Sequence, residues 1–314
     1  MKLVVIIPAY NEEKTISQVI KEIPRNIPQI EKTEVLVIND GSTDNTKKVA
    51  KEAGADYIVS NLDNQGLALA FKRGLEEALK LGADIIVNID ADFQHDPLEI
   101  PNLIQPILKE EAEMVIGNRQ IRKSNNMEPA KKYGNIILSW VLRMLLRNKI
   151  SDVSCGFRAY SRECTLRLNI FSHHTYTHET IIQCSFNRMR IVEVPITFRK
   201  REGDKSRLIR SLWDYIKLAG ATIIRVYFMY NPLKTSLKIG TLIGLTGLFF
   251  ELRYLWFYFS GEGGRHLPSI ILGTTLVIIS VLIIIIGFLA DLIDANRKRE
   301  EEILYRLKKK DYGK

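Results

Sequence analysis

Two aspartates separated by one residue, Asp90 and Asp92, follow a short apolar segment, and Gln94 lies two residues further on. At the end of a strand, two such carboxylates can converge on one divalent cation and on a diphosphate bound to it. Mg²⁺ and Mn²⁺ prefer hard oxygen ligands and retain water or phosphate oxygens as their other ligands. An isolated pair of this kind would more often cap a helix, so its surroundings decide the interpretation. We predict that Asp90, Asp92 and Gln94 form a site for Mg²⁺ or Mn²⁺.

Other polar motifs follow other short apolar segments. Asp40 comes after the second segment, where it can accept hydrogen bonds from a base or a ribose, while Gly41 permits a tight turn. Tyr10 follows the first segment and offers an aromatic wall, and Asp44 is expected to cap the next helix. The expected strands are 3–7, 34–38, 57–59, 85–89 and 114–116, and the expected helices are 13–22, 45–53, 66–81 and 98–109. This alternation predicts an α/β fold with a mostly parallel sheet, on which ligands bind beyond the carboxyl ends of the strands.

Long apolar segments lie in the C-terminal third of the chain. Ser269–Ala290 is 22 residues without a charge, about 33 Å as a helix, which is enough to cross a hydrocarbon core of about 30 Å. A second apolar segment, Leu237–Phe259, has Glu251 and Arg253 near its far end among aromatic residues, as in an interfacial belt. Basic residues precede the first span and follow the second, so the positive-inside rule predicts a cell-membrane hairpin with the N-terminal domain and the C-terminal tail in the cytoplasm.

One face of the first expected span carries Gly240, Gly244 and Gly247. Small residues on one face let membrane helices approach closely. This face could pack against the second span of the same hairpin or against a neighbouring subunit, in which case the protein would be a homo-oligomer.

Charge is unevenly distributed along the chain. Residues 1–130 contain 15 Lys and Arg against 21 Asp and Glu, whereas residues 131–314 contain 30 against 15. An acidic first part suits a metal-assisted site, and a basic second part suits lipid headgroups or phosphate. The basic residues adjoin apolar runs and form no known nucleic-acid motif, so we expect no nucleic-acid partner. Residues 135–146 and 208–230 have the pattern of basic amphipathic helices, which lie in the headgroup plane or pack on the soluble domain.

Three longer motifs complete the pattern: Asp-Ala-Asp-Phe-Gln-His-Asp-Pro at 90–97, Ser-Cys-Gly-Phe-Arg-Ala-Tyr at 154–160, and Val-Pro-Ile-Thr-Phe-Arg-Lys-Arg-Glu-Gly-Asp-Lys-Ser at 194–206. With the motifs above, they resemble the family-2 glycosyltransferases of the GT-A fold, and among these the polyprenyl-phosphate (dolichyl-phosphate) sugar synthases. The resemblance implies a GT-A, Rossmann-like catalytic domain over 1–205. We expect amphipathic juxtamembrane helices over 206–234, two transmembrane helices over 235–293, and a basic cytoplasmic tail over 294–314.

The resemblance also implies roles for individual residues. The nucleoside of the donor would be held by Pro8, Tyr10, Glu12 and Asp40, and the ribose, diphosphate and metal by Asp90, Asp92 and Gln94. Arg119 and Arg201 match arginines around the donor and acceptor phosphates. Lys131 or Lys132 occupies the place of a basic residue in a mobile loop where Arg is common, and a lysine there acts as a point charge.

A phosphate acceptor is already ionised near neutral pH, so the reaction needs cations to bring two anions together more than it needs a strong base. We therefore predict inverting, metal-dependent transfer of a hexose from a nucleotide-sugar to polyprenyl or dolichyl phosphate, for glycan assembly. The resemblance favours a UDP-sugar over GDP-mannose. Asp152 is added to Asp92, Arg119 and Arg201 as a catalytic group, with Glu179 as another base or orienting residue, while His173, His174 and His178 are expected in a polar loop.

Two alternatives remain open at this stage. One is a catalytically silent membrane scaffold on the same fold, against which the intact aspartate motif argues. The other is a polysaccharide-elongating glycosyltransferase, which usually carries a Gln-x-x-Arg-Trp motif and more spans than this chain. The three cysteines lack metal-ligand spacing and are expected to be reduced thiols.

Overall fold

The computed structural model describes residues 1–121, 129–146, 148–171, 176–199, 220–221, 228 and 230–313. Its internal contacts divide the chain into two units. The α/β unit comprises Met1–Ile224 and Leu304–Lys314, and the helical unit comprises Arg225–Ile303. The predicted domain boundary at residue 205 and most of the predicted juxtamembrane helices fall outside the described residues.

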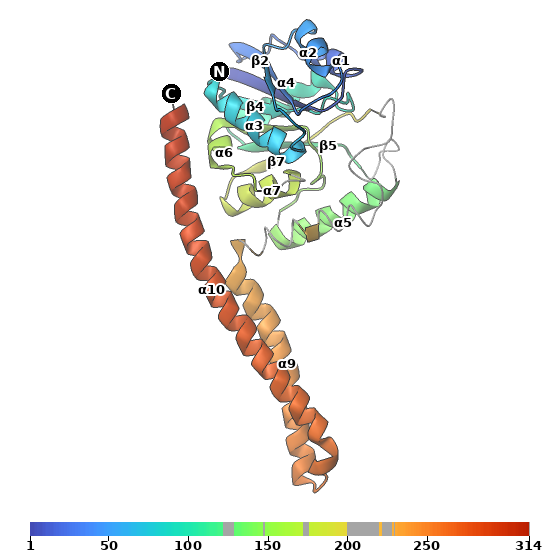
Figure 1. The fold of residues 1–314 in the computed structure, drawn as a ribbon, viewed down its shortest axis with the longest axis vertical. Helices are drawn as coiled ribbons and strands as arrows, with labels where there is room; N and C mark the ends of the chain where they lie inside the picture. The colour runs from blue at the N-terminus through green and yellow to red at the C-terminus, as the bar shows by residue number, and fades with distance from the viewer. Residues whose placement is uncertain are drawn as a thin grey trace. The chain divides into compact units, whose positions relative to one another are not determined.

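A seven-stranded sheet forms the centre of the α/β unit, in the order β3-β2-β1-β4-β6-β5-β7 (Figure 1). All pairings are parallel except those of β6, which runs antiparallel to both of its neighbours, β4 and β5. Consequently β6 begins at the edge where the other strands end. The strands are β1 (Lys2–Ala9), β2 (Lys32–Asn39), β3 (Tyr57–Ser60), β4 (Ile85–Asn88), β5 (Met114–Asn118), β6 (Arg158–Ser161) and β7 (Ile191–Pro195).

The central strands are buried on both faces, which is why they read in the sequence as continuous apolar runs. Every residue from Leu3 to Ile7 in β1 is 0% exposed. The buried face of α3 packs on β1 and β2, and α4 packs on β4, β5 and β6. The helices of this unit are α1 (Ile16–Glu22), α2 (Thr46–Glu52), α3 (Leu67–Lys80), η1 (Pro97–Glu99), α4 (Ile100–Leu108), α5 (Pro129–Leu146), α6 (Arg162–Arg167) and α7 (Thr177–Phe186).

These elements confirm the predicted α/β class and the predicted order of its first five strands and four helices. The last predicted helix, 98–109, is divided into the short 3₁₀ turn η1 and the helix α4. The segments β6, α6, α7 and β7 had no counterpart in the sequence-based prediction.

Helix α5 has two unlike faces. Leu138 and Leu142 are buried, whereas Tyr133, Ile137, Trp140 and Met144 are 45–62% exposed at spacings of four, three and four residues. This spacing places the four exposed side chains along one stripe of the helix. The amphipathic helix predicted over 135–146 is therefore present, and its exposed stripe is apolar.

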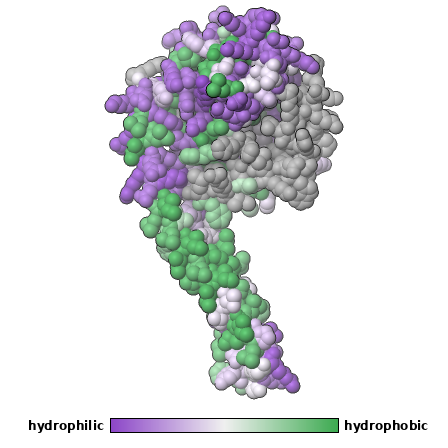
Figure 2. Space-filling model, viewed as in Figure 1, coloured by the Kyte–Doolittle hydropathy of each residue, from purple (hydrophilic) through white to green (hydrophobic). Residues whose placement is uncertain are grey.

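The helical unit is a hairpin of two long helices, α9 (Pro232–Phe259) and the first part of α10 (Leu267–Tyr312), joined through the turn η2 (Gly263–His266). By length and composition, each of the two helices could cross a membrane. Figure 2 shows their surface as largely hydrophobic, with polar residues gathered at the tip of the hairpin. The two predicted spans thus correspond to two helices that expose apolar side chains along their length.

The glycine face of α9 packs against α10 of the same chain. A Cβ atom added at Gly240 would lie 2.6 Å from Ile284, and one added at Gly244 would lie 2.7 Å from the Ser280 hydroxyl. That hydroxyl donates a hydrogen bond to the carbonyl of Gly240 at 2.7 Å. The sequence left open whether this glycine face packs against the second helix of the hairpin or against a neighbouring subunit. The structure shows the first of these two arrangements.

The end of α10 belongs to the α/β unit, where it contacts α6. The Tyr305 hydroxyl donates to the Glu163 carboxylate at 3.1 Å, and the Arg167 guanidinium lies 3.9 Å from the centre of the Tyr305 ring. Lys308 donates to the carbonyl of Leu168 at 2.9 Å. The segment predicted to be a basic tail is therefore helical as far as Tyr312.

Candidate active site

Four of the predicted motifs lie at one edge of the sheet. Tyr10 follows β1, Asp40 follows β2, Asp90 comes two residues after β4, and Arg119 follows β5. Because β6 runs in the opposite direction, the segment 152–157 that leads into it lies at this same edge. β7 is parallel to β5 and also ends here, so the edge collects side chains from the ends of β1, β2, β4, β5 and β7 and from the beginning of β6.

Asp40 is buried, and its carboxylate is held by the loop after β3. It accepts hydrogen bonds from the Asn61 side chain at 2.6 Å and from the backbone amides of Gln65 and Gly66 at 3.0 and 2.8 Å. Gly41 has a φ of +69°, and a Cβ atom there would lie 2.5 Å from the backbone of residue 63. Asp40 therefore fixes the loop that begins α3, in addition to the nucleoside contact predicted for it.

The other predicted nucleoside residues surround the end of β1. Pro8 is buried within the strand, and Tyr10 is 37% exposed just beyond it. The backbone amide of Glu12 donates to the Thr46 hydroxyl at 2.8 Å, and its carboxylate accepts from the Thr15 hydroxyl at 3.2 Å. Glu12 thereby joins the start of α1 to the start of α2. Its predicted contact with a donor remains a prediction.

Asp90 lies against a wall that leaves no room for a side chain at position 156. A Cβ atom added at Gly156 would lie 2.9 and 3.1 Å from the two carboxylate oxygens of Asp90. On another side, His95 Nε2 lies 3.6 Å from Asp90 Oδ2. The His95 ring is buried and stacks 5.4 Å from the ring of Phe157. Asp90 is itself 32% exposed, so it remains accessible from the solvent side.

Asp92 and Gln94 lie on the turn that follows Asp90. The Asp92 carboxylate accepts a hydrogen bond from the backbone amide of Gln94 at 3.2 Å. Between them, Phe93 has a φ of +59°, a left-handed conformation that bulky residues rarely adopt and that is concentrated at functional sites. Among the described residues, no three His, Cys, Asp or Glu side chains are grouped to hold a metal ion by themselves. Two carboxylates and one amide oxygen suit Mg²⁺ or Mn²⁺, which take several ligands from water and phosphate.

Arg119 and Asp152 form a nearly buried ion pair. The guanidinium donates two hydrogen bonds to the carboxylate, at 2.8 and 2.7 Å, and the backbone amide of Arg119 donates a third at 3.1 Å. The Asn135 side chain donates to the same carboxylate at 2.8 Å. Burial opposes ionisation of Asp152, but the charge and hydrogen bonds of Arg119 and the bond from Asn135 outweigh it and lower the pKa of this carboxyl. Asp152 is therefore a weak base that orients Arg119.

Glu179 was expected to be a base or orienting residue, and His178 was expected in a polar loop, but both lie in α7 and are buried. Glu179 is 1% exposed, and its carboxylate accepts from the backbone amide of Phe171 at 3.0 Å. Burial, reinforced by the nearby charge of Arg158, lowers the pKa of His178 to about 3, so this imidazole is neutral. Both side chains are interior groups. His173 and His174 lie outside the described residues.

Arg199 is a site residue that the sequence analysis missed. Its backbone amide donates to the carbonyl of Gln94 at 2.8 Å, and its guanidinium pairs with Asp96 at 2.8 Å and lies 4.2 Å from the centre of the Phe93 ring. The motif at 194–206 contains this residue, but the predicted role was given to Arg201. Arg201 and the side chain of Lys131 lie outside the described residues, while Lys132 lies on α5.

Phe198 lies between the two charged parts of the site. Its ring centre is 5.5 Å from that of His95, and the Arg119 guanidinium lies 5.3 Å from its centre. The preceding residue, Thr197, donates its backbone amide to the Glu99 carboxylate at 2.9 Å. The segment after β7 is thus tied to the turn that carries the aspartates.

Arg158 is a second missed residue, and it is 0% exposed. Its guanidinium donates to the backbone carbonyls of Cys155, Val153 and Thr177 at 2.6–2.8 Å. The motif at 154–160 contains this arginine, so the sequence could have indicated its importance. Arg158 fixes the backbone of the segment that places Asp152 and Gly156.

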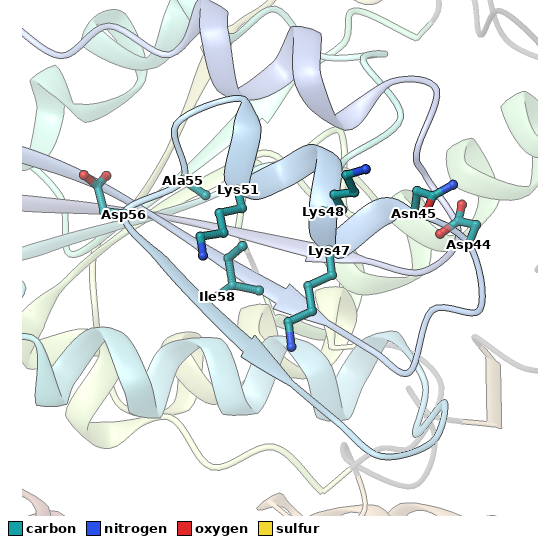
Figure 3. Close-up of a pocket in the computed structure, with 8 residues that line it drawn as sticks. All are labelled: Asp44, Asn45, Lys47, Lys48, Lys51, Ala55, Asp56 and Ile58. Carbon is teal, nitrogen blue, oxygen red and sulfur yellow. The ribbon is translucent and has the colours of Figure 1, made fainter.

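A separate surface pocket lies between α2 and β3 and includes none of the residues predicted for the site. Figure 3 shows lysines of α2 extending beside Ile58 of β3. The lining residues are Asp44, Asn45, Lys47, Lys48, Lys51, Ala55, Asp56 and Ile58. Asp44 also accepts from the backbone amide of Thr46 at 3.0 Å, as expected of a residue at a helix start.

The mixed, mostly parallel sheet with acidic and basic side chains at its carboxyl edge has the GT-A fold of glycosyltransferases, which the similar solved structures share. The family model described as glycosyl transferase family 2 matches residues 4–167, more than half of the chain. The chain belongs to this family and is a glycosyltransferase.

Several curated relatives act on polyprenyl phosphates, according to their names. The chain is 34% identical to UDP-N-acetylglucosamine–dolichyl-phosphate N-acetylglucosaminyltransferase of Methanococcus voltae over 213 residues, which cover 61% of this chain and 83% of the relative. It is 29% identical to dolichol-phosphate mannosyltransferase of Pyrococcus furiosus over 269 residues, covering 82% of this chain and 72% of the relative. Among solved structures, glucosyl-3-phosphoglycerate synthase of Mycobacterium tuberculosis with Mn²⁺, UDP and phosphoglyceric acid is similar, with a TM-score of 0.56, 25% identity, and coverage of 72% of this chain and 77% of the other.

Proposed function

We propose that this glycosyltransferase moves a hexose from a nucleotide-sugar to a polyprenyl or dolichyl phosphate, giving a lipid-linked sugar for glycan assembly. The observation that carries the proposal is the presence, in one chain, of the Asp90, Asp92 and Gln94 oxygen set at the sheet edge and of two membrane-length apolar helices. The names of the relatives from M. voltae and P. furiosus support the same reaction. A UDP-sugar is the favoured donor, with GDP-mannose as the alternative.

The described residues account for the donor side of the reaction. Asp90, Asp92 and Gln94 would hold a divalent Mg²⁺ or Mn²⁺, which would supply charge stabilisation for the departing diphosphate. The solved relative with Mn²⁺ and UDP supports this choice of metal. Pro8, Tyr10, Glu12 and Asp40 surround the nucleoside. Direct displacement by the acceptor phosphate inverts the anomeric centre.

Cationic groups serve the acceptor side, because two anions must approach each other. Asp152 holds Arg119 in a two-pronged hydrogen bond, which fixes the orientation of the guanidinium plane. Arg201, Lys131 and Lys132 complete the phosphate-binding set in this proposal. An ionised phosphate oxygen needs no proton removed, which agrees with the depressed pKa of Asp152.

The acceptor's lipid chain requires a membrane next to the site. The apolar stripe of α5 (Tyr133, Ile137, Trp140 and Met144) suits contact with the headgroup region, where aromatic rings are favoured. We place α9 and the first part of α10 across the cell membrane, with the α/β unit in the cytoplasm according to the positive-inside rule. The glycine face of α9 is used within the hairpin, so it lends no support to the predicted homo-oligomer.

A donor panel tests the proposal. Purified full-length protein is incubated with polyprenyl phosphate, Mn²⁺ and one donor at a time from UDP-glucose, UDP-N-acetylglucosamine and GDP-mannose, and the lipid product is measured by mass. One added hexose per lipid is expected with a UDP-sugar. A ladder of products would indicate a polysaccharide-elongating enzyme, and no product with any donor would favour the silent scaffold.

A further inference from the structure

Beneath Asp90 lies a buried polar side chain at the end of β4. Asn88 is 0% exposed, and its side-chain amide donates two hydrogen bonds of 2.8 Å each, one to the carbonyl of Gly156 and one to the Tyr176 hydroxyl. Both amide hydrogens of Asn88 are used by these two bonds. The Tyr176 oxygen is therefore an acceptor toward Asn88, and its own hydrogen must point elsewhere.

The Tyr176 ring is fixed in place by an aromatic neighbour. It is 1% exposed and stacks on Phe71 of α3 with a centroid distance of 3.8 Å and an interplanar angle of 14°. A ring held on one face by Phe71 and at its hydroxyl by Asn88 has little freedom to rotate away. A neutral tyrosine hydroxyl carries one hydrogen and can both accept and donate a hydrogen bond.

The position next to Gly156 Cα is shared by the hydroxyl and the carboxylate. A Cβ atom built there would lie 3.0 Å from the Tyr176 oxygen and 2.9 and 3.1 Å from the two Asp90 oxygens. Both groups thus border the same small space, which exists only because residue 156 is glycine. The Tyr176 hydrogen that Asn88 leaves unused can point across this space toward the Asp90 carboxylate.

We propose that Tyr176 is a positioning residue for Asp90, and that its hydroxyl, aligned by Asn88, orients the carboxylate toward the divalent cation across the space left by Gly156. The inference rests on the metal site of the proposed function. The inference adds three residues to those that support the metal ligand Asp90. They are Asn88 at the end of β4, Gly156 before β6 and Tyr176 at the start of α7. Partners that orient a metal ligand typically contribute about 10–100-fold to metal affinity.

The test is the dissociation constant of Mn²⁺ alone, measured on the full-length protein by electron paramagnetic resonance. Tyr176→Phe removes only the hydroxyl, and we expect it to weaken Mn²⁺ binding about 10-fold or more. Tyr160→Phe is the matched control. Tyr160 is also 0% exposed and lies near Phe71, with ring centres 5.8 Å apart, but it belongs to β6, and its hydroxyl makes no hydrogen bond among the described residues. We expect the control to bind Mn²⁺ within twofold of wild type.

A second variant tests the shared space without touching the tyrosine. Gly156→Ala places a methyl group 2.9–3.1 Å from the two Asp90 oxygens and the Tyr176 oxygen, and we expect a similar loss of Mn²⁺ affinity. The thermal midpoint of each variant separates this loss from unfolding. Equal affinities for Tyr176→Phe and Tyr160→Phe, or wild-type affinity of Gly156→Ala, would overturn the inference.

The result is also distinguishable from failure of the proposed function. Wild-type protein that binds Mn²⁺ but transfers no sugar to polyprenyl phosphate would refute the acceptor assignment and leave the role of Tyr176 intact. Wild-type protein that binds no Mn²⁺ at millimolar concentration would overturn both the metal site and the role of Tyr176.

Discussion

Changing Asp152 to Asn should destabilise the α/β unit measurably, because it removes the carboxylate charge that pairs with the Arg119 guanidinium. Both side chains are largely withdrawn from solvent, with exposed fractions of 11% for Arg119 and 1% for Asp152. Removing one partner of a buried ion pair costs about 3–5 kcal/mol. The remaining exposure of Arg119 lets water reach the cation in part, so we expect a value near the lower limit, about 3 kcal/mol.

The assay is thermal unfolding of the purified protein in detergent. For domains of 150–250 residues, each kcal/mol shifts the midpoint by about 2–4 °C, so Asp152→Asn should lower it by roughly 6–12 °C. The control is Glu77→Gln, which breaks a surface pair with Lys80 and should cost at most about 1 kcal/mol.

A rescue experiment separates the ion pair from general damage. Adding Arg119→Gln to Asp152→Asn removes the cation that has lost this carboxylate, so the double variant should recover part of the lost stability. The reasoning about this pair is wrong if Asp152→Asn unfolds at the wild-type temperature. It is also wrong if Arg119→Gln lowers the unfolding temperature of Asp152→Asn as much as it lowers that of the wild type.

The lowered pKa of Asp152 also predicts how the stability of the folded protein depends on pH. Because the folded-state pKa of Asp152 is lowered, its contribution to stability is present above the ordinary aspartate pKa of about 3.9 and is lost as the pH falls through the lowered value. The difference between wild type and Asp152→Asn should therefore be constant from pH 5 to pH 8 and shrink below about pH 4. A difference that disappears between pH 6 and pH 7 would contradict the assignment to this carboxyl.

Three further predictions concern the metal, the acceptor phosphate and the hairpin. Asp92→Asn should lower turnover by about 10²–10³ even at saturating Mn²⁺, measured as product formed per unit time, and near-wild-type turnover would remove Asp92 from the metal site. Arg201→Ala should severely weaken turnover or acceptor affinity, with Arg201→Lys recovering only part because it loses the guanidinium fork; normal kinetics of both variants would leave Arg201 as a juxtamembrane charge. Gly244→Leu should lower the thermal stability of the hairpin, because a Cβ atom there already meets Ser280 at 2.7 Å, while donor binding is unchanged; wild-type stability would mean that this face contacts lipid.

The early part of the fold was predictable from the sequence because its strands are buried on both faces. Each of β1, β2 and β4 is a short apolar run followed by a polar motif, and such runs stand out in a chain. The later strands lacked this signal. β6 begins with the buried Arg158 and β7 contains Glu193, so neither reads as a continuous apolar segment.

The site could be predicted only as far as its motifs extended. Asp90, Asp92 and Gln94 form a contiguous pattern, and the structure places them on one turn. The roles of Asn88 and Tyr176 depend on a contact between residues 88 positions apart, which no local spacing reveals. Asp152 was selected in the sequence as a possible base because it is an acidic residue. Its pairing with Arg119 could not be predicted, because it depends on the antiparallel direction of β6.

The chain enters the helical unit at residue 225 and leaves it at residue 303, and residues 304–314 return to the α/β unit. In terms of connectivity, the membrane hairpin is an insertion within the α/β unit. Truncation at residue 224 would therefore remove the helix end that covers α6 and leave the binding site of Tyr305 beside Glu163 and Arg167 bare. A water-soluble version of this enzyme should instead be made by joining residue 224 to residue 304 through a flexible linker, which keeps Tyr305 and Lys308 in the molecule.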